Sequence, residues 1–241
     1  MRQGSVLAPA LFAVYINDIL KAASRNPYGY ILAYADDLLI IARSCLGLQI
    51  LFDIVSKEIE SLCLELNISK SCCLRIGNRF NIPCLGIATS NGAYVKHVDR
   101  FRYLGVTIVS ARNFCCSVDS MKRSFNRAVN SIIGKLGCSS NEDVIVHLIK
   151  TNCLPILLYG SEASSLKKAQ LLSLDFFVVR FGMKLFHTGS RPLVVEAFEN
   201  LGLVLPSVTV PERCKKFLTK FVESDNIMCK IICAKFNVDG I

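Results

Sequence analysis

Residues 34–42 read YADDLLIIA, and place two adjacent aspartates, Asp36 and Asp37, inside an otherwise apolar stretch. An unpaired carboxylate buried in a strand costs several kcal/mol, so two of them need a specific explanation. Because side chains alternate along a strand, adjacent aspartates reach one site only where a turn interrupts the alternation. We therefore predict a tight hairpin with strands at 30–35 and 38–42 and both carboxylates at its tip.

Such a tip has two interpretations. Mg²⁺ prefers hard oxygen ligands and is often held by one or two carboxylates together with substrate phosphates. Two ions of this kind can activate an attacking hydroxyl and stabilise a leaving phosphate, which predicts a magnesium site at Asp36 and Asp37. An ordinary solvated turn is the alternative, because aspartate is favoured in turns anyway. The spacing alone leaves both interpretations open.

Composition favours a folded, basic, intracellular protein. Of the 241 residues 52% are apolar, enough for a core, and the net charge of +9 favours an acidic partner such as nucleic acid or an anionic surface. A merely soluble basic protein is the alternative. The twelve cysteines, with adjacent pairs at 72–73 and 115–116, indicate buried free thiols in a reducing compartment and no disulfide-linked partner. The run 144–159 is too short and polar for a span of about 20 residues, which predicts a buried helix and no membrane partner.

The hydrophobic pattern changes near residue 110. Before it we expect a helix entered near Pro9, the hairpin, an amphipathic helix over 48–66 and short strands at 71–76, 83–87 and 101–108. After it we expect a basic helix over 118–136 and further helical stretches at roughly 141–153, 164–181, 192–201 and 210–235. The pattern predicts an α+β half, residues 1–110, and a helical half, residues 111–241.

Several segments occur in the order seen in reverse transcriptases of the non-LTR retrotransposon (LINE-type) branch. They are RQGSVLAPALFAVYINDI (2–19), YADDLLI (34–40), LNISK (66–70) and FRYLGVTI (101–108), while LPILLYGSEA (154–163) is similar to a segment found after the palm. The resemblance implies a partial polymerase palm, an antiparallel sheet with packed helices, followed by a thumb-like helical region. It also implies an RNA-directed DNA polymerase that uses Mg²⁺, an RNA template, a DNA primer and deoxynucleoside triphosphates.

By this resemblance, Asp36 and Asp37 match the catalytic metal-binding pair, with Asp36 as the more direct ligand. Tyr34 and Ala35 match positions near the primer end. Lys70 matches a lysine that contacts the nucleotide's phosphates and protonates the leaving pyrophosphate. From the residues alone, an exposed turn residue is the favoured interpretation of Lys70.

Two further segments match substrate-contacting parts of the family. The loop that lies along the templating base and incoming nucleotide corresponds to Arg2, Gln3 and Gly4. The hairpin that holds the primer terminus corresponds to Tyr103, Leu104 and Gly105, although a plain strand end with a glycine gives the same pattern. In the helical half, four basic side chains would contact the phosphate backbone of a template–primer duplex. They are Lys122, Arg123, Arg127 and Lys135. A solvated helix face is the alternative there.

The family's first catalytic aspartate lies upstream of the RQG loop, which begins here at Arg2. We expect no other carboxylate to replace it, since Asp18 lies on the following helix and Asp53 on an outward helix face. Loss of a principal metal ligand should cost several kcal/mol of transition-state stabilisation, so we expect little or no polymerase activity. The alternative is a non-catalytic nucleic-acid-binding remnant of a retroelement. A nucleotide cyclase on a palm-type hairpin is disfavoured, because its Gly-Gly-acidic turn is missing.

Overall fold

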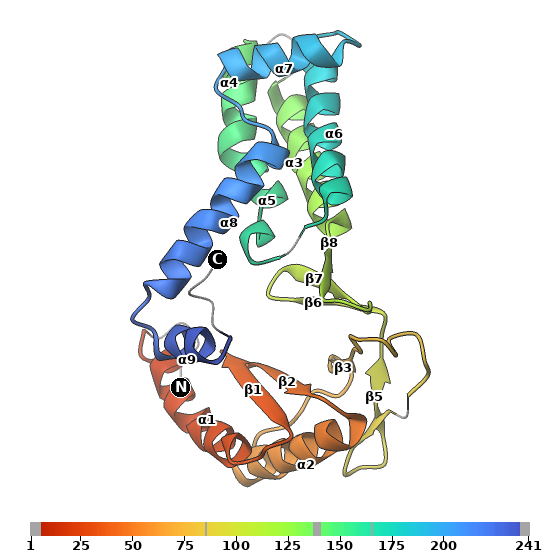
Figure 1. Cartoon of the computed structure of the whole chain (residues 1–241), viewed down its shortest axis with the longest axis vertical. Helices are drawn as coiled ribbons and strands as arrows, with labels where there is room; N and C mark the ends of the chain where they lie inside the picture. The colour runs from red at the N-terminus through yellow and green to blue at the C-terminus, as the bar shows by residue number, and fades with distance from the viewer. Residues whose placement is uncertain (1–5, 85, 137–140, 165, 237–241) are drawn as a thin grey trace. The chain divides into compact units, whose positions relative to one another are not determined.

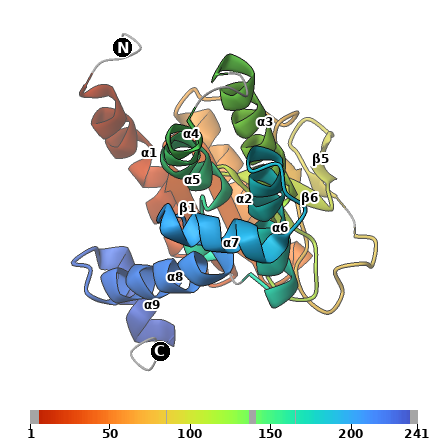
Figure 2. The ribbon, with the colours of Figure 1, turned by 90° about the horizontal axis from the view of Figure 1, so that it is seen from above.

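The computed structural model describes residues 6–84, 86–136, 141–164 and 166–236. The chain divides into two compact units, residues 1–101 with 110–113 and residues 102–109 with 114–241. Figure 1 follows the chain from red at the N-terminus to blue at the C-terminus, and Figure 2 gives a second view of the same elements. Each unit has hydrophobic clusters of its own.

The first unit is built around the hairpin of β1 (Gly29–Tyr34) and β2 (Asp37–Ala42), which pair antiparallel as predicted. Helices α1 (Ala8–Ser24) and α2 (Cys45–Ser61) contact this hairpin and each other, as the lower part of Figure 1 shows. Their apolar stripes meet in a cluster, because residues three and four apart lie on one helix face. The buried members are Ile16, Ile19, Val55 and Ile59.

The rest of this unit has very short strands. They are β3 (Cys72–Cys73), β4 (Ile87–Ala88) and β5 (Tyr94–His97), in the order β3-β5-β4. The pairing of β4 with β5 is antiparallel, but that of β3 with β5 is parallel. The strands expected at 71–76 and 83–87 are therefore only partly formed, and β5 was not expected.

The second unit begins with a small sheet and continues as helices. The sheet order is β6-β7-β8, from β6 (Arg100–Tyr103), whose last two residues lie in this unit, β7 (Val106–Val109) and β8 (Cys115–Ser117). The single strand expected at 101–108 is therefore a hairpin, and β8 was missed. The long helices are α3 (Asp119–Leu136), α6 (Lys168–Leu185), α7 (Arg191–Asn200), α8 (Pro206–Val222) and α9 (Ile227–Phe236).

The predicted buried helix after residue 141 is present, but it is interrupted. It consists of α4 (Glu142–Leu148), a π turn (Ile149–Cys153) and α5 (Leu154–Leu157). Pro155 removes one N–H from the backbone ladder directly after the π turn, which is a recognised cause of helix irregularity. Among the described residues, Glu142–Ala163 forms a 22-residue stretch that is long and apolar enough to cross a membrane. By length and composition, the expectation that this run is too short and too polar for a span is therefore wrong. Of its most apolar window 44% is buried within the protein, and these buried side chains belong to the unit's core.

The core of the second unit joins α3 to α7. Its fully buried members include Phe125 of α3, Ile149 of the π turn, Val178 of α6 and Phe198 of α7. In Figure 1, α7 lies across one end of α4 and α6. The buried carboxylate of Asp175 on α6 accepts a hydrogen bond from the Ser207 N–H at 2.8 Å, and so stabilises the N-terminal end of α8.

The described cysteines are free thiols. The expectation that the thiols are buried is wrong for Cys45, Cys63 and Cys72, which are exposed. The mixed α+β composition agrees with the predicted class, a partial palm followed by a helical region. The assignment of residues 1–110 and 111–241 to palm and thumb stays a prediction.

Candidate active site

The two aspartates lie at the tip of the first unit's hairpin. Strand pairing runs from Gly29 opposite Ala42 to Tyr34 opposite Asp37, which leaves Ala35 and Asp36 as a two-residue turn. Ala35 has a φ of 51°, a left-handed conformation that a residue with a Cβ adopts at a cost of about 1–2 kcal/mol. The turn breaks the alternation of the strands, as the sequence requires for both carboxylates to reach one end of the hairpin.

Both carboxylates are exposed to solvent. Within the described part of the chain, neither the Asp36 nor the Asp37 carboxylate takes part in a hydrogen bond or an ion pair. Their oxygens are therefore free to bind a cation without breaking a protein contact. Two exposed carboxylates at one hairpin tip are a donor set that fits Mg²⁺, provided that other oxygen ligands such as substrate phosphates complete the shell.

One face of this hairpin carries large apolar side chains in solvent. Tyr30, Leu32 and Tyr34 alternate along β1 with exposed fractions of 52%, 36% and 63%, so the face extends to the residue opposite Asp37. The alternation of strand side chains could have identified Tyr30 and Leu32 from the sequence, but only Tyr34 was predicted. An exposed aromatic ring beside a carboxylate can stack on a base or sugar.

Lys70 lies in a turn that Asn67 organises. The side-chain oxygen of Asn67 accepts hydrogen bonds from the Lys70 N–H at 3.1 Å and the Ser69 hydroxyl at 2.7 Å, while its carbonyl accepts from the Ser71 hydroxyl at 2.9 Å. This is the local hydrogen bonding that makes asparagine a turn residue. The Lys70 side chain is exposed. Sequence reasoning missed Asn67, although its place in the LNISK segment is a usable signal.

The predicted grouping of Lys70 with the aspartates and the RQG loop stays a prediction. Arg2, Gln3 and Gly4 lie outside the described residues. Among the described residues, no hydrogen bond or ion pair joins Lys70 to Asp36 or Asp37.

In the second unit, Tyr103 ends β6, and Leu104 and Gly105 form the turn to β7. Both turn residues have positive φ, 45° at Leu104 and 86° at Gly105, as expected for a type I′ hairpin. A bulky residue in this conformation is uncommon and is held there by its surroundings. The Tyr159 hydroxyl donates a hydrogen bond to the Leu104 carbonyl at 3.0 Å, and a Cβ at Gly105 would lie 2.8 Å from the Tyr159 ring.

Two segments of the resemblance, 101–108 and 154–163, therefore meet through Tyr159. The hydrogen bond joins two residues, Leu104 and Tyr159, that are 55 positions apart in the sequence. Beside this contact is a surface pocket of about 480 Å³. It is lined by Arg102, Leu104, Gly105, Ser120, Met121, Ser124, Pro155, Ile156 and Tyr159. The pairing of a strained turn with a pocket makes this end of the second unit a candidate contact surface.

The basic residues of α3 do not form one uniform face. Arg123, Arg127 and Lys135 are exposed. Lys122 is turned into the protein, with 14% of its side chain exposed, its ammonium 3.9 Å from Asp119 and 5.4 Å from the centre of the Phe177 ring. Lys122 is thus engaged within its own unit, whereas the other three side chains extend into solvent.

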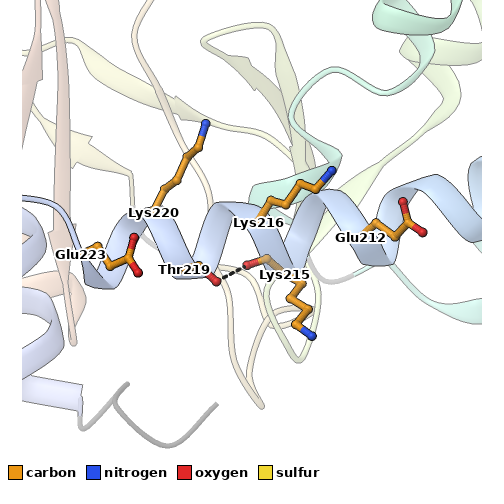
Figure 3. Close-up of a pocket in the computed structure, with 6 residues that line it drawn as sticks. All are labelled: Glu212, Lys215, Lys216, Thr219, Lys220 and Glu223. Carbon is orange, nitrogen blue, oxygen red and sulfur yellow. Dashed lines mark hydrogen bonds between the residues drawn. The ribbon is translucent and has the colours of Figure 1, made fainter.

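A second basic group lies on α8 and was not predicted as a site. A hollow of about 640 Å³ is lined by Glu212, Lys215, Lys216, Thr219, Lys220 and Glu223. Figure 3 shows that Lys216 and Lys220 extend to one side of the helix and Lys215 to the other. Glu212 and Glu223, which flank the three lysines, reduce the positive field here, so this surface is a weaker candidate for phosphate than the exposed arginines of α3.

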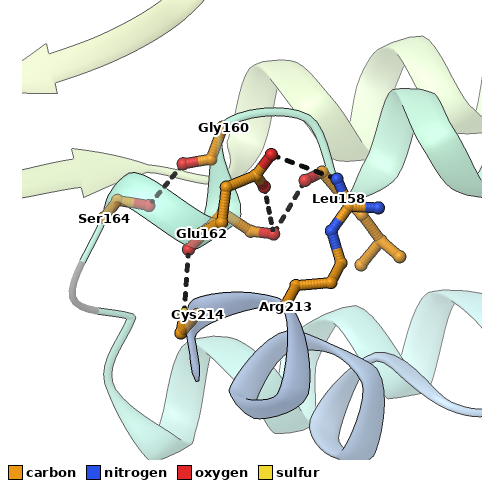
Figure 4. A network of polar contacts seen from close by, with 7 residues as sticks. Leu158, Gly160, Glu162, Ser164, Arg213 and Cys214 are labelled. Atoms are coloured by element: carbon orange, nitrogen blue, oxygen red, sulfur yellow. Dashed lines mark hydrogen bonds and ion pairs between the residues drawn. The ribbon is translucent and has the colours of Figure 1, made fainter. Parts of the chain in front are cut away.

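Glu162 has a structural role, in which it joins the segment 158–164 to α8. Its carboxylate pairs with Arg213 of α8 at 3.1 Å, and the buried hydroxyl of Ser161 donates to the Leu158 carbonyl at 2.7 Å. The Cys214 thiol lies 3.6 Å from the Ser161 carbonyl. Figure 4 shows this network joining the segment 158–164 to α8. These polar contacts give part of the LPILLYGSEA segment a purely structural role.

The two carboxylates considered as substitutes for a third ligand have local partners. Asp18 is paired with Lys21 at 3.2 Å, and Asp53 accepts a hydrogen bond from Gln49 at 2.7 Å. Within the described ranges, no group of three or more His, Cys, Asp or Glu side chains is arranged to hold a metal. The aspartate pair is therefore a partial ligand set.

Comparison with known proteins agrees with these features. The family described as reverse transcriptase (RNA-dependent DNA polymerase) matches residues 1–108. The RNA-directed DNA polymerase from mobile element jockey of Drosophila melanogaster is 26% identical over 176 residues, which are 66% of this chain and 18% of that protein.

Two other relatives belong to retrotransposable elements. The Pol polyprotein of the type-1 element R1 3 of Nasonia vitripennis is 26% identical over 141 residues, 54% of this chain and 37% of that protein. The Pol polyprotein of the type-2 element R2DM of Drosophila melanogaster is 25% identical over 131 residues, 48% of this chain and 12% of that protein. The chain thus spans well under half the length of these curated relatives. Residues 1–108 thus match the reverse transcriptase family, and the chain is similar to reverse transcriptases of LINE-type, non-LTR retrotransposons.

Proposed function

We propose that this chain carries the aspartate-bearing part of the palm of an RNA-directed DNA polymerase. In that reaction a primer 3′-hydroxyl attacks the α-phosphate of a deoxynucleoside triphosphate, the bond to the β-phosphate breaks, and pyrophosphate leaves. The observation that carries the proposal is the pair of exposed carboxylates at the hairpin tip, which no described residue engages. A turn held in a left-handed conformation at Ala35 further supports it, because strained backbone concentrates at functional sites.

Asp36 and Asp37 would hold Mg²⁺, with Asp36 as the principal ligand. Bound Mg²⁺ would neutralise negative charge on the phosphates and lower the pKa of the attacking hydroxyl. The backbone that carries the two carboxylates is fixed for this task, because strand pairing fixes Asp37 and the two-residue turn fixes Asp36.

The neighbouring residues would position the substrates. Tyr34, exposed opposite Asp37, would stack on the primer end, and Ala35 leaves room for it. Lys70, in its Asn67-capped turn, would place an ammonium on the nucleotide phosphates and donate a proton to pyrophosphate. Arg2, Gln3 and Gly4 would contact the templating base and nucleotide.

The second unit would contribute nucleic-acid contacts. The turn at Tyr103, Leu104 and Gly105, fixed by Tyr159, would hold the primer terminus. Arg123, Arg127 and Lys135 would contact backbone phosphates of an RNA–DNA duplex without reading its sequence. Lys122 is a weaker candidate because Asp119 and Phe177 already engage it.

We further propose that polymerase activity of this chain is low. The described residues gather no third carboxylate, histidine or cysteine beside the aspartate pair. One ligand missing from a metal site weakens the charge stabilisation on which phosphoryl transfer depends.

Primer extension on an RNA template tests the proposal. We expect slow, Mg²⁺-dependent incorporation by the parent chain and a decrease of about a hundredfold in Asp36→Ala, because the variant loses the principal metal ligand. Asp18→Ala is the matched control, since it removes an exposed carboxylate whose described partner is Lys21, and it should keep the parent rate. Equal incorporation by the parent and Asp36→Ala would contradict catalysis at the hairpin.

The second candidate function, a non-catalytic nucleic-acid-binding remnant, is favoured by the exposed cations of α3. Filter binding of an RNA–DNA hybrid across a salt series measures this contribution. We expect the double variant Arg123→Gln/Arg127→Gln to have a less steep decrease of log affinity with log salt. The slope should become less negative by about 2, since two phosphate contacts are lost. Lys122→Gln should leave the slope unchanged, because its ammonium is engaged by Asp119 and Phe177. A slope that is flat in the parent would exclude electrostatic backbone binding.

A further inference from the structure

Two cysteines far apart in sequence lie in contact in the first unit. The Sγ atoms of Cys45 and Cys84 are 2.8 Å apart, and 39 residues separate them. Cys45 is the first residue of α2, directly after the N-cap Ser44, and is exposed, while Cys84 precedes β4 and is partly exposed. Both sulfurs are free thiols and are accessible to a small reagent.

Arg75 completes this cluster. Its Nη2 donates a hydrogen bond to the Cys45 sulfur at 3.1 Å, while its Nη1 donates to the carbonyls of Arg79 at 3.2 Å and Ile82 at 3.1 Å. One guanidinium therefore places positive charge against Cys45 and holds the segment that leads to Cys84.

These contacts assign different roles to the two thiols. Cys45 accepts from Arg75, so the shared proton of the thiol pair is better placed on Cys84. The hydrogen bond from Cys84, followed by that from Arg75, lowers the pKa of Cys45 from its ordinary value, and the same thiol contact raises the pKa of Cys84. The N-terminal end of α2 also favours a thiolate at Cys45.

We propose that Cys45 and Cys84 form a peroxide-responsive thiol pair that closes to a disulfide. The Cys45 thiolate attacks hydrogen peroxide, so that an S–O bond forms, the O–O bond breaks, and the released hydroxide takes up a proton as water. Cys84 then attacks the Cys45 sulfur, the S–S bond forms, the S–O bond breaks, and hydroxide leaves with the Cys84 proton as a second water. In total the two thiols lose two electrons, and one hydrogen peroxide accepts them and is reduced to two waters.

The surrounding thiols are poor competitors. Burial raises the pKa of Cys73, the nearby third thiol, to about 11, and burial also raises that of Cys72. Cys63 is exposed, but no hydrogen bond to its sulfur occurs within the described residues. Exposure without an activating donor gives slow oxidation, so Cys63 is a matched control for Cys45.

The disulfide would act on the fold of the first unit. It would tie the start of α2 to the segment before β4, which pairs with β5. A bond across 39 residues restricts the unfolded chain, so oxidation should raise the melting temperature by about 5 °C.

Trypsin separates the relevant cysteines. Cleavage after arginine and lysine leaves Cys45 alone on residues 44–57, Cys84 alone on 80–96 and Cys63 alone on 58–70. After treatment of the full chain with hydrogen peroxide, mass spectrometry should find peptides 44–57 and 80–96 linked, with the loss of two hydrogens. Reduction with dithiothreitol should separate them.

Variants distinguish the steps. Cys84→Ser should leave a Cys45 sulfenic acid that dimedone labels, Cys45→Ser should abolish the cross-link, and Cys63→Ser should leave it unchanged. Arg75→Met should slow cross-linking about tenfold, because it removes the activating donor. Circular dichroism at 222 nm shows whether each variant remains folded. A peroxide-treated parent in which 44–57 stays unlinked, or in which 58–70 is oxidised at the same rate, would overturn the proposal.

Discussion

Replacing Gly29 with alanine should destabilise the first unit by about 3 kcal/mol or more. A Cβ built at Gly29 lies 2.0 Å from the Ile41 carbonyl oxygen and 2.9 Å from the fully buried Leu51 side chain. The carbonyl belongs to the paired strand and cannot retreat without separating β1 from β2, so the overlap is relieved only by opening the hairpin. Because Asp37 lies at the other end of that pairing, the change should also loosen the candidate site.

Urea unfolding followed by circular dichroism measures the stability, and amide hydrogen exchange of residues 29–42 locates the damage. Ala35→Gly is the control at the opposite end of the hairpin. It relieves the positive φ of 51° and should leave stability unchanged or raise it by about 1 kcal/mol. A Gly29→Ala chain with the parent's unfolding midpoint and the parent's protection of 29–42 would mean that the strands are not paired in this register.

Local pattern was sufficient to predict the hairpin and most long helices. The hairpin follows from two apolar runs separated by aspartates, and α1 and α3 follow from apolar residues spaced by three and four. The single strand that the hydrophobic pattern predicted over 101–108 was wrong because Leu104 turns the chain, whereas the hairpin turn that the resemblance implied at 103–105 is present. A leucine at a φ of 45° is disfavoured locally, and only the Tyr159 contact from 55 residues away stabilises it.

The end of α2 shows a second limit of periodicity. The apolar stripe predicted a helix over 48–66, but α2 ends at Ser61, and Cys63 adopts a φ of 55°. Leu64 and Leu66 still pack against the core, although they lie outside the helix. A hydrophobic stripe records which side chains are buried, and an extended segment can bury them as well as a helical one.

For the candidate site, the chemistry read from the sequence stays a prediction, and the structure adds local geometry. The resemblance named Asp36, Asp37 and Lys70, and the structure adds the Ala35–Asp36 turn, with Asp37 as the first residue of β2, and the Asn67 cap for the lysine. The contact of Cys45 with Cys84 had no local signal, because it depends on how a loop returns to the start of α2. Long-range contacts of this kind are set by packing and not by spacing.

A Gly182→Val substitution should destabilise the second unit by about 3–4 kcal/mol. The helix predicted over 164–181 stopped before this glycine, yet α6 continues through it to Leu185. A Cβ at Gly182 would lie 2.4 Å from the Val194 Cγ1 and 2.5 Å from the Phe198 Cζ, and both of those side chains are fully buried. Phe198 is further fixed by ring contacts with Phe181 and Phe186 at 6.3 and 5.7 Å between ring centres. The glycine is therefore where α7 approaches α6, and added methyl groups have no room.

Alanine substitutions separate packing from helix propensity. Gly182→Ala should cost about 2 kcal/mol, whereas Gly134→Ala in α3, where a Cβ meets nothing within 4 Å, should stabilise by about 1 kcal/mol. The same chemical change thus has opposite signs at two helical glycines, and thermal unfolding of both variants beside the parent measures the difference. If Gly182→Ala instead stabilised the chain as much as Gly134→Ala, then α7 would not pack on α6 through this glycine. The continuation of α6 beyond residue 181 would then need a cause other than close helix packing.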